Sequence, residues 1–149
     1  MSNNRKEIES GLIVSIIPSN LNKSFQDIKL SNIQMDCNVI GVMSGSDTFN
    51  SLGEGGIWVS DINGTISSGD YITSSILHGY GQKQDSDFME NYTVAKIIQN
   101  CYFNEHENLR YLSLSDDCLT LDIVPKEEYL LNPDKYFRAQ FVGCTYHCG

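Results

Sequence analysis

The chain has 149 residues, 40% of them hydrophobic, which is the composition of one globular domain rather than of a disordered segment. Nineteen Asp and Glu against ten Lys and Arg give a formal net charge of −9. This charge disfavours nucleic acid and anionic membranes as partners, because no basic stripe is present to contact phosphate groups. No apolar run is long enough for a membrane-spanning helix, and "MSNNRKEIES" lacks the apolar core of a signal peptide.

The first third of the chain predicts three strands after a flexible tail at residues 1–10. "SGLIVSIIP" (10–18) is an apolar run that ends in proline, Ile28 and Leu30 alternate with Lys29, and "CNVIGVM" (37–43) is rich in apolar residues. Gly41 inside the third strand indicates a bulge or a close backbone approach. Residues 44–56 are dense in Ser, Gly and Asp and predict a loop.

The most regular stretch is "EGGIWVSDINGTISSGDYITSS" (54–75). Apolar residues alternate from residue 57, which predicts a strand. Asn63-Gly64 is typical of a two-residue type I′ hairpin turn, with Thr65 and Ile66 starting the return strand. Gly69-Asp70 marks a second tight turn before the strand at 71–75. We expect three short strands folded on one another as scaffold, and Gly64→Val is expected to destabilise the fold.

The second half predicts further strands and one helix. Residues 76–87 are expected to be a loop, and "YTVAKIIQNCYF" (92–103) is the longest β-like run. "YLSL" (111–114) and "LTLDIV" (119–124) are shorter strands, residues 125–132 a short helix, and "RAQFVGCTYHCG" a strand-like piece with a Cys-rich end. Eight or nine short strands predict one all-β domain over residues 1–149, a compact hairpin-rich sandwich or irregular barrel with at most this one helix.

The C-terminal "CTYHC" gathers soft ligands of the kind that bind zinc. Its spacing is not that of a standard zinc finger, and a fourth ligand would have to come from elsewhere in the chain. Buried free thiols are the favoured interpretation, with a Cys144–Cys148 disulfide and a metal site as alternatives. No metal, cofactor or catalytic residue is therefore assigned. The residues in question are Cys144, His147 and Cys148, with His78, His106, Cys101 or Cys118 as the fourth ligand.

Other polar groupings have simpler explanations than catalysis. Ser44-Gly45-Ser46-Asp47 is typical of turns, and "GEGG" (53–56) lacks the G-K-S/T end of a phosphate loop. Three N-glycosylation sequons, at Asn22, Asn63 and Asn91, are explained by turns or by chance without a secretory signal. Seven of the eight tyrosines lie in the second half, a bias that suits an interface or core packing. The paired carboxylates predict a solvated acidic surface: Asp85/Asp87, Glu105/Glu107, Asp116/Asp117 and Glu127/Glu128.

Four pieces of the chain occur in an order that resembles a known family. They are "VIGVMS" (39–44), the segment 62–72, "GYGQKQ" (79–84) and "VAK" (94–96). In this order they are similar to the C-terminal β domain of phage appendage and tail-fibre proteins, the peptidase G2 group of intramolecular-chaperone autoproteolytic domains. Related domains occur in surface or fibre proteins of giant DNA viruses. The resemblance spans residues 12–103 and rests mostly on turns and alternating apolar residues.

The resemblance implies a structural and assembly domain of a viral fibre or surface protein. Such a domain would act in the virion, after assembly in the host cytoplasm, as an oligomeric cap, with a homotrimer as the expected state. Self-cleavage in a longer precursor is the alternative enzymatic function. It is not favoured, because the expected cleavage junction and a long chaperone helix are both missing. A third alternative is a free-standing module that binds a host glycan or protein.

Overall fold

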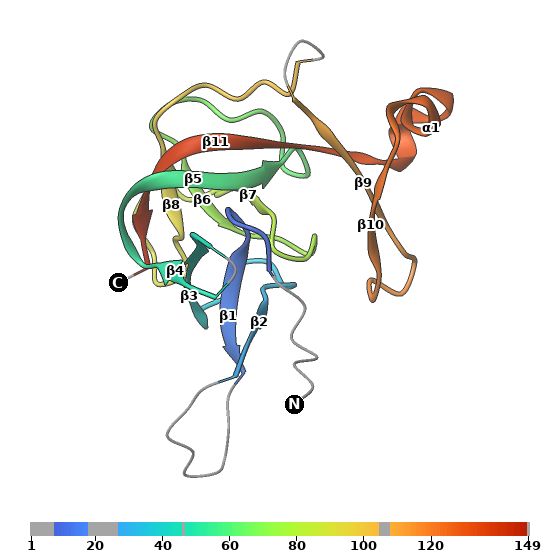
Figure 1. Ribbon diagram of the computed structural model, residues 1–149. Helices are drawn as coiled ribbons and strands as arrows, with labels where there is room; N and C mark the ends of the chain where they lie inside the picture. Colours follow the sequence, from blue (N-terminus) through green and yellow to red (C-terminus); the bar gives the residue numbers. More distant parts are fainter. Residues whose placement is uncertain (1–7, 18–26, 46, 105–107, 149) are drawn as a thin grey trace.

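The computed structural model describes residues 8–17, 27–45, 47–104 and 108–148 (Figure 1). The described chain is all-β with one short α-helix, as predicted. A four-stranded sheet has the order β2-β1-β3-β4, and a seven-stranded sheet has the order β10-β9-β11-β5-β7-β6-β8. The elements are β1 (Ile13–Ile17), β2 (Asp27–Leu30), β3 (Val39–Met43), β4 (Phe49–Asn50), β5 (Leu52–Ser60), β6 (Tyr71–Ser74), β7 (Gly81–Lys83), β8 (Ala95–Ile97), β9 (Arg110–Leu114), β10 (Leu121–Val124), α1 (Lys126–Leu131), the 3-10 helix η1 (Pro133–Lys135) and β11 (Phe137–His147).

Five strands of the larger sheet close into a ring. β11 pairs with β5 along one edge and with β8 along the other. β6 pairs with both β7 and β8, and the single parallel pair Val59–Gly81 joins β7 to β5. A closed ring leaves none of these five strands as a free edge, so it is a small irregular barrel, one of the two predicted architectures.

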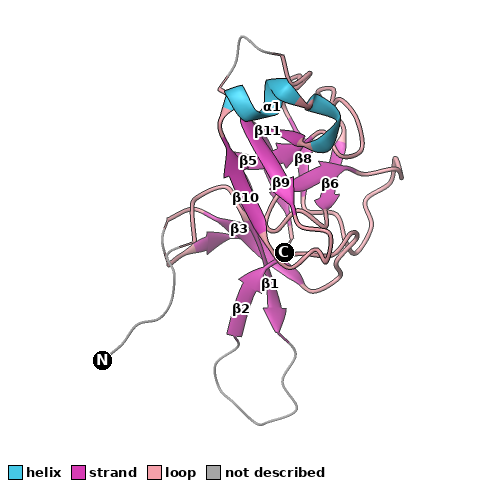
Figure 2. Ribbon diagram, turned by 90° about the vertical axis from the view of Figure 1, so that its right-hand side faces the viewer, coloured by secondary structure: helices cyan, strands magenta, loops and turns pink. Residues whose placement is uncertain are grey.

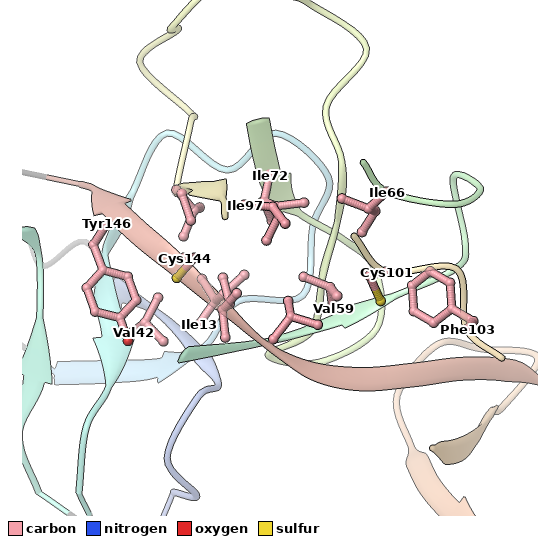
Figure 3. Close-up of a cluster of buried hydrophobic side chains, with 14 residues drawn as sticks. Ile13, Val42, Val59, Ile66, Ile72, Ile97, Cys101, Phe103, Cys144 and Tyr146 are labelled. Carbon is pink, nitrogen blue, oxygen red and sulfur yellow. The ribbon is translucent and has the colours of Figure 1, made fainter. Parts of the chain in front are cut away.

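The pairing of β11 with β5 is the longest in the molecule. Nine residue pairs run without interruption from Ala139–Ser60 to His147–Leu52. Side chains alternate along β11, so Val142, Cys144 and Tyr146 point into the barrel. Figure 3 shows Cys144 and Tyr146 among the side chains of the main apolar cluster. This cluster contains Ile13, Val42, Ile57, Val59, Ile66, Ile72, Val94, Ala95, Ile97, Cys101, Phe103, Val142, Cys144 and Tyr146.

Two glycines in β5 make room for two aromatic rings of β11. A Cβ on Gly55 would overlap the buried ring of Tyr146, and a Cβ on Gly56 would overlap the ring of Phe141 on the opposite face. The Tyr146 hydroxyl donates a hydrogen bond of 2.7 Å to the Gly56 carbonyl. An aromatic ring lying over a glycine of the neighbouring strand is a known way to fix register. The run "GEGG" is therefore part of a strand, and the prediction of a loop over 44–56 is wrong from residue 49 on, where β4 and β5 begin.

A buried carboxylate joins the four-stranded sheet to the barrel. Asp36 is 3% exposed, and its Oδ2 accepts hydrogen bonds from the hydroxyls of Ser15 (2.5 Å) and Ser31 (2.9 Å). The Asp36 amide donates to the hydroxyl of Ser74 in β6. Both serine hydroxyls are buried, and both donate their hydrogen bonds to the carboxylate, so this cluster has a structural role.

The stretch 54–75 folds differently from the predicted hairpin. The Gly64 amide donates to the Asp61 carbonyl at 2.9 Å, and Gly64 (φ +92°), not Asn63, has the positive φ. The following segment does not pair back onto β5, since Ile66 forms an isolated bridge with Cys101. The type I′ hairpin prediction is wrong, because both central residues of that turn need positive φ. Asn63 instead binds β7, donating to the Lys83 carbonyl at 2.7 Å.

Other predictions have mixed outcomes. The tight turn at residues 67–70 is confirmed by the hydrogen bond from the Asp70 amide to the Ser67 carbonyl, with Gly69 at φ +97°. The close approach at Gly41 is confirmed, because a Cβ there would lie 2.7 Å from the Asn50 carbonyl oxygen. The expected long strand over 92–103 contains only β8, and the expected loop over 76–87 contains β7. The longest strand is β11, which runs into the Cys-rich tail.

We predict that Gly55→Ala destabilises the protein more than Gly56→Ala. Alanine normally suits a strand better than glycine, so each cost would come from the ring opposite. The Tyr146 ring is buried and hydrogen-bonded, whereas Phe141 is 50% exposed and can move outward. Urea denaturation should show a loss of about 1–3 kcal/mol for Gly55→Ala, the usual cost of overpacking, and a smaller loss for Gly56→Ala. Equal stability of both variants and the wild type would contradict the ring-over-glycine packing.

We predict that Gly64→Ala and Gly69→Ala each lower the free energy of unfolding by about 1–2 kcal/mol, because both glycines have positive φ. No atom lies within 4 Å of an added Cβ at either glycine, so the loss of stability would come from the backbone conformation rather than from a steric clash. The same reason applies to the destabilisation expected for Gly64→Val. Gly45→Ala is the matched control in a turn without positive φ. An unchanged denaturation midpoint for Gly64→Ala would contradict the turn geometry.

Candidate interaction surface

A hairpin and helix stand off from the barrel. Residues 108–136, called the arm here, contain β9, β10, α1 and η1, and Figure 1 shows them set to one side of the barrel. β9 joins the seven-stranded sheet by pairing with the start of β11, and β10 pairs with β9 as the outermost strand. Figure 2 looks onto this side of the molecule, with α1 above the hairpin. The arm is therefore an extension of the sheet rather than a separate unit.

The hairpin packs on the body with one face. Leu112 is fully buried in a second apolar cluster with Trp58 and Tyr80, and Leu114 and Leu121 pack against that cluster. At the tip of the hairpin, His78 Nε2 lies 2.9 Å from the Cys118 carbonyl oxygen. One face of the arm is thus fixed by apolar burial.

Tyrosines hold α1 on the opposite face of the hairpin. The rings of Tyr111 in β9 and Tyr129 in α1 stack at 4.2 Å between centroids, and Tyr129 lies 6.4 Å from Tyr136. The Tyr136 hydroxyl donates to Glu128 at 3.3 Å. These three residues belong to the tyrosine bias seen in the sequence, and the arm brings them together.

The arm leaves large apolar side chains in solvent. No residue of α1 is buried, and none of β10 is buried either. A six-residue helix is too short to be stable by itself, so burial of its apolar side chains would be expected to contribute. The exposed large apolar side chains of the arm are Leu119 (77% exposed) at the hairpin tip, Ile123 (59%) in β10, and Leu130 (53%) and Leu131 (86%) in α1. Adjacent exposed leucines such as those of α1 are characteristic of interaction surfaces.

A hollow of about 360 Å³ lies between the start of β9, the end of β10 and the start of α1. Ile123, Val124 and Tyr111 supply its apolar lining, and Arg110 and Lys126 supply its cationic groups. The arm thus carries exposed apolar side chains and a concavity that is lined by both apolar and cationic groups. Such a pair of features is what a self-complementary contact requires.

An ion pair anchors the base of the arm. Arg110 donates hydrogen bonds to both carboxylate oxygens of Glu9, and the bond to Oε1 is 2.7 Å long. The Nη1 atom of Arg110 also lies 3.1 Å from the Tyr80 hydroxyl. The guanidinium also stacks over the Trp58 ring at 3.8 Å. The hydrogen bond and charge of Arg110 lower the pKa of Glu9, and burial raises the pKa of Tyr80. Next to Glu9, Ile8 packs against the second apolar cluster.

The Cys-rich tail is not assembled as a metal site. Cys144 points into the barrel, whereas His147 lies on the outer face, 3.0 Å from the Thr145 hydroxyl. Cys144 and Cys148 are free thiols, and burial raises their pKa to about 12 and about 11. Four extended residues span about 13 Å, which is too far for a disulfide. In the described ranges no three His, Cys, Asp or Glu side chains gather as metal ligands, and His106 lies outside those ranges.

The remaining sequence candidates have structural partners. The Ser44 hydroxyl lies 3.1 Å from that of Thr48, as in a turn, and Ser46 is outside the described residues. Asp117 accepts from the Ser115 hydroxyl and the Leu119 amide, which lowers its pKa and stabilises the tip of the arm. Glu105 and Glu107, like the sequon at Asn22, lie outside the described residues. None of the helices in the described part of the chain has the length and apolarity to span a bilayer.

No protein-family model, curated protein or solved structure matches this chain. The arm and its contacts are therefore interpreted from their own chemistry. Sequence reasoning identified the tyrosine bias but not the exposed leucines of α1. The helix prediction at 125–132 contained the signal, because its adjacent leucines could not both be buried by one short helix.

We predict that Glu9→Gln destabilises the protein at neutral pH but not in acid. The pKa of Glu9 is lowered in the folded state, so the stabilisation is present above its ordinary pKa of 4.5 and is lost as the pH falls through the lower folded value. The pair is partly exposed, which limits its contribution to about 1 kcal/mol or less. Thermal melts near pH 7 and near pH 3 provide the measurement, with the exposed Glu127→Gln as control. A deficit of Glu9→Gln that is equal at both pH values would contradict the ion pair.

Proposed function

We propose that this protein is a structural assembly module that associates with further copies of itself through the arm. The observation that carries the proposal is the exposure of Leu130 and Leu131 on a helix that buries none of its own residues.

A second copy is the partner that the arm fits best. The exposed Leu130 and Leu131 lie on α1, and the hollow is lined by Tyr111 of β9 and by Ile123 and Val124 of β10. If the leucines of one copy fill the hollow of the next, reciprocal contacts close a dimer and repeated head-to-tail contacts close a ring. Aromatic residues are enriched at the centres of such interfaces, and the arm contributes the half-buried Tyr129 and Tyr136.

The specific setting we propose is the capping or assembly domain of a viral fibre or surface protein. What supports it is the order of strand and turn motifs between residues 12 and 103. A fibre cap joins several chains at one end, so a trimer is the state that this setting requires. The place of action would be the virion.

Charge predicts how the association depends on salt. The arm has six acidic and three basic side chains, and the whole chain carries −9. Two copies therefore repel one another, and salt screens that repulsion while leaving apolar contact in place. Association of the arm with a basic partner would have the opposite salt dependence.

We predict an oligomer in size-exclusion chromatography with light scattering, and a shift towards monomer in the double variant Leu130→Ser/Leu131→Ser. Both leucines are exposed, so the free energy of unfolding should change by no more than about 0.5 kcal/mol per substitution. Phe88→Ser is the control, because Phe88 is 76% exposed but lies outside the arm. Self-association should strengthen between low and high salt.

A wild-type chain that stays monomeric at high concentration and high salt would contradict self-association. A dimer would keep the arm contact but contradict the trimeric fibre setting. Equal dissociation of the Phe88→Ser control would show that the arm is not the contact surface.

A further inference from the structure

The strand β10 leaves one of its two edges open. It is the outermost strand of the seven-stranded sheet, and in the described part of the chain it pairs with β9 alone. An open edge presents N–H and C=O groups to which an extended segment can add as a further strand. The groups that β10 presents follow from the alternation of its ladder with β9.

The hydrogen bonds of the hairpin decide which residues of β10 face outward. Next to the turn, the Ser115 amide donates to the Thr120 carbonyl at 2.9 Å, so these two residues form a hydrogen-bonded pair. Hydrogen-bonded and non-hydrogen-bonded pairs alternate along an antiparallel ladder. In the register of β9 and β10, Leu121 and Ile123 therefore belong to the non-hydrogen-bonded pairs. Their N–H and C=O groups point away from β9, and none of these groups bonds to another described residue.

A single charge lies at the centre of this open edge. Asp122, between the two outward-facing residues, is exposed and forms no hydrogen bond or ion pair with any residue that the structure describes. Ile123 beside it is 59% exposed. A strand added along the edge would set its central residue directly opposite Asp122, where side chains of neighbouring strands interact.

A second copy of β10 is poorly suited to this edge. Two copies related by a twofold axis would pair Leu121 of one copy with Ile123 of the other, which joins all the outward-facing groups. This register places Asp122 opposite Asp122 of the second copy, at about 4.5 Å between their Cα atoms. Like charges directly opposite one another destabilise a strand pair.

The two neighbouring registers lose hydrogen bonds instead. A shift by two residues in one direction sets Leu121 opposite Pro125, which has no N–H and whose carbonyl already accepts from two amides of α1. A shift in the other direction requires Leu119, whose amide already donates to Asp117 Oδ1 at 3.0 Å. Each register available to a second copy is therefore opposed by like charge or by missing hydrogen bonds.

We propose that the open edge of β10 binds an extended segment of a different chain, with a Lys or Arg of that segment opposite Asp122. The outward-facing groups of Leu121 and Ile123 supply the backbone hydrogen bonds, and Asp122 selects for the cation. The net charge of −9 also favours the approach of a basic segment. The edge uses none of the leucines of α1, so this inference does not depend on the proposed self-association.

A charge swap supplies a partner strand whose register is known. The variant Asp122→Lys has the same edge with a cation at its centre, and Asp122 is exposed, so the substitution retains the fold. Both chains carry Leu130→Ser/Leu131→Ser, so that contact through the leucines does not contribute and the two proposals are tested separately. The chain with Asp122 intact is isotope-labelled and titrated at low salt with the unlabelled Asp122→Lys chain, while its amide shifts are followed by NMR.

The control is a charge change of the same size away from the edge. Asp116→Lys, made in the same leucine-free background, alters the net charge equally at the exposed tip of the hairpin. It leaves the β10 edge unchanged, so it measures how much binding comes from net charge alone.

We expect saturable shifts at the amides of Leu121 and Ile123. Binding in the mixture should be about tenfold tighter than binding of either chain to itself, because an opposite-charge pair replaces a like-charge pair. Added salt should weaken it. The proposal is overturned if the mixture binds no more tightly than each chain alone, if Asp116→Lys binds as tightly as Asp122→Lys, or if the shifts lie away from β10.

Discussion

The nine-residue pairing of β11 with β5 is the constraint on which the rest of the structure depends. β5 occupies one edge of β11 throughout, and the other edge is shared between β9 at its beginning and β8 near its end. The gap between them is bridged by the Gln99 side chain, which accepts from the Gly143 amide. Barrel closure and arm attachment therefore rest on one strand, and its register decides both.

Register is fixed from both faces of that strand pair. Tyr146 covers Gly55 inside the barrel, and Phe141 covers Gly56 outside it. A slip by one residue would exchange the two faces, exposing the buried tyrosine and placing a side chain over each ring. The two rings lie in different environments, because Tyr146 is buried and Phe141 is 50% exposed.

Local sequence signals predicted the all-β class, the single helix and the tight turn at residues 67–70, because each depends on neighbouring residues. These local signals failed where the conformation of a segment depends on a residue far away in the sequence. "GEGG" has a loop's composition, and only the rings of Tyr146 and Phe141, some 90 residues away, explain it as strand. Asn63-Gly64 has the composition of a hairpin turn, but β5 already has β11 and β7 as partners and leaves no edge for a return strand.

The candidate surface likewise combines features that the sequence indicates with contacts that depend on distant residues. A concentration of tyrosines in the second half could be seen in the sequence, and the structure stacks Tyr111 on Tyr129. The pairing of Glu9 with Arg110 joins residues 101 positions apart, so no spacing could indicate it.

Native-state hydrogen exchange tests the central role of β11 most directly. Amides of its C-terminal half, enclosed by β5 and β8, should exchange only through global unfolding and be the slowest in the protein. Amides of β10, the outermost strand, should exchange by local opening at much lower free energy. Amides of residues 144–146 that exchange as fast as those of β10 would contradict the account.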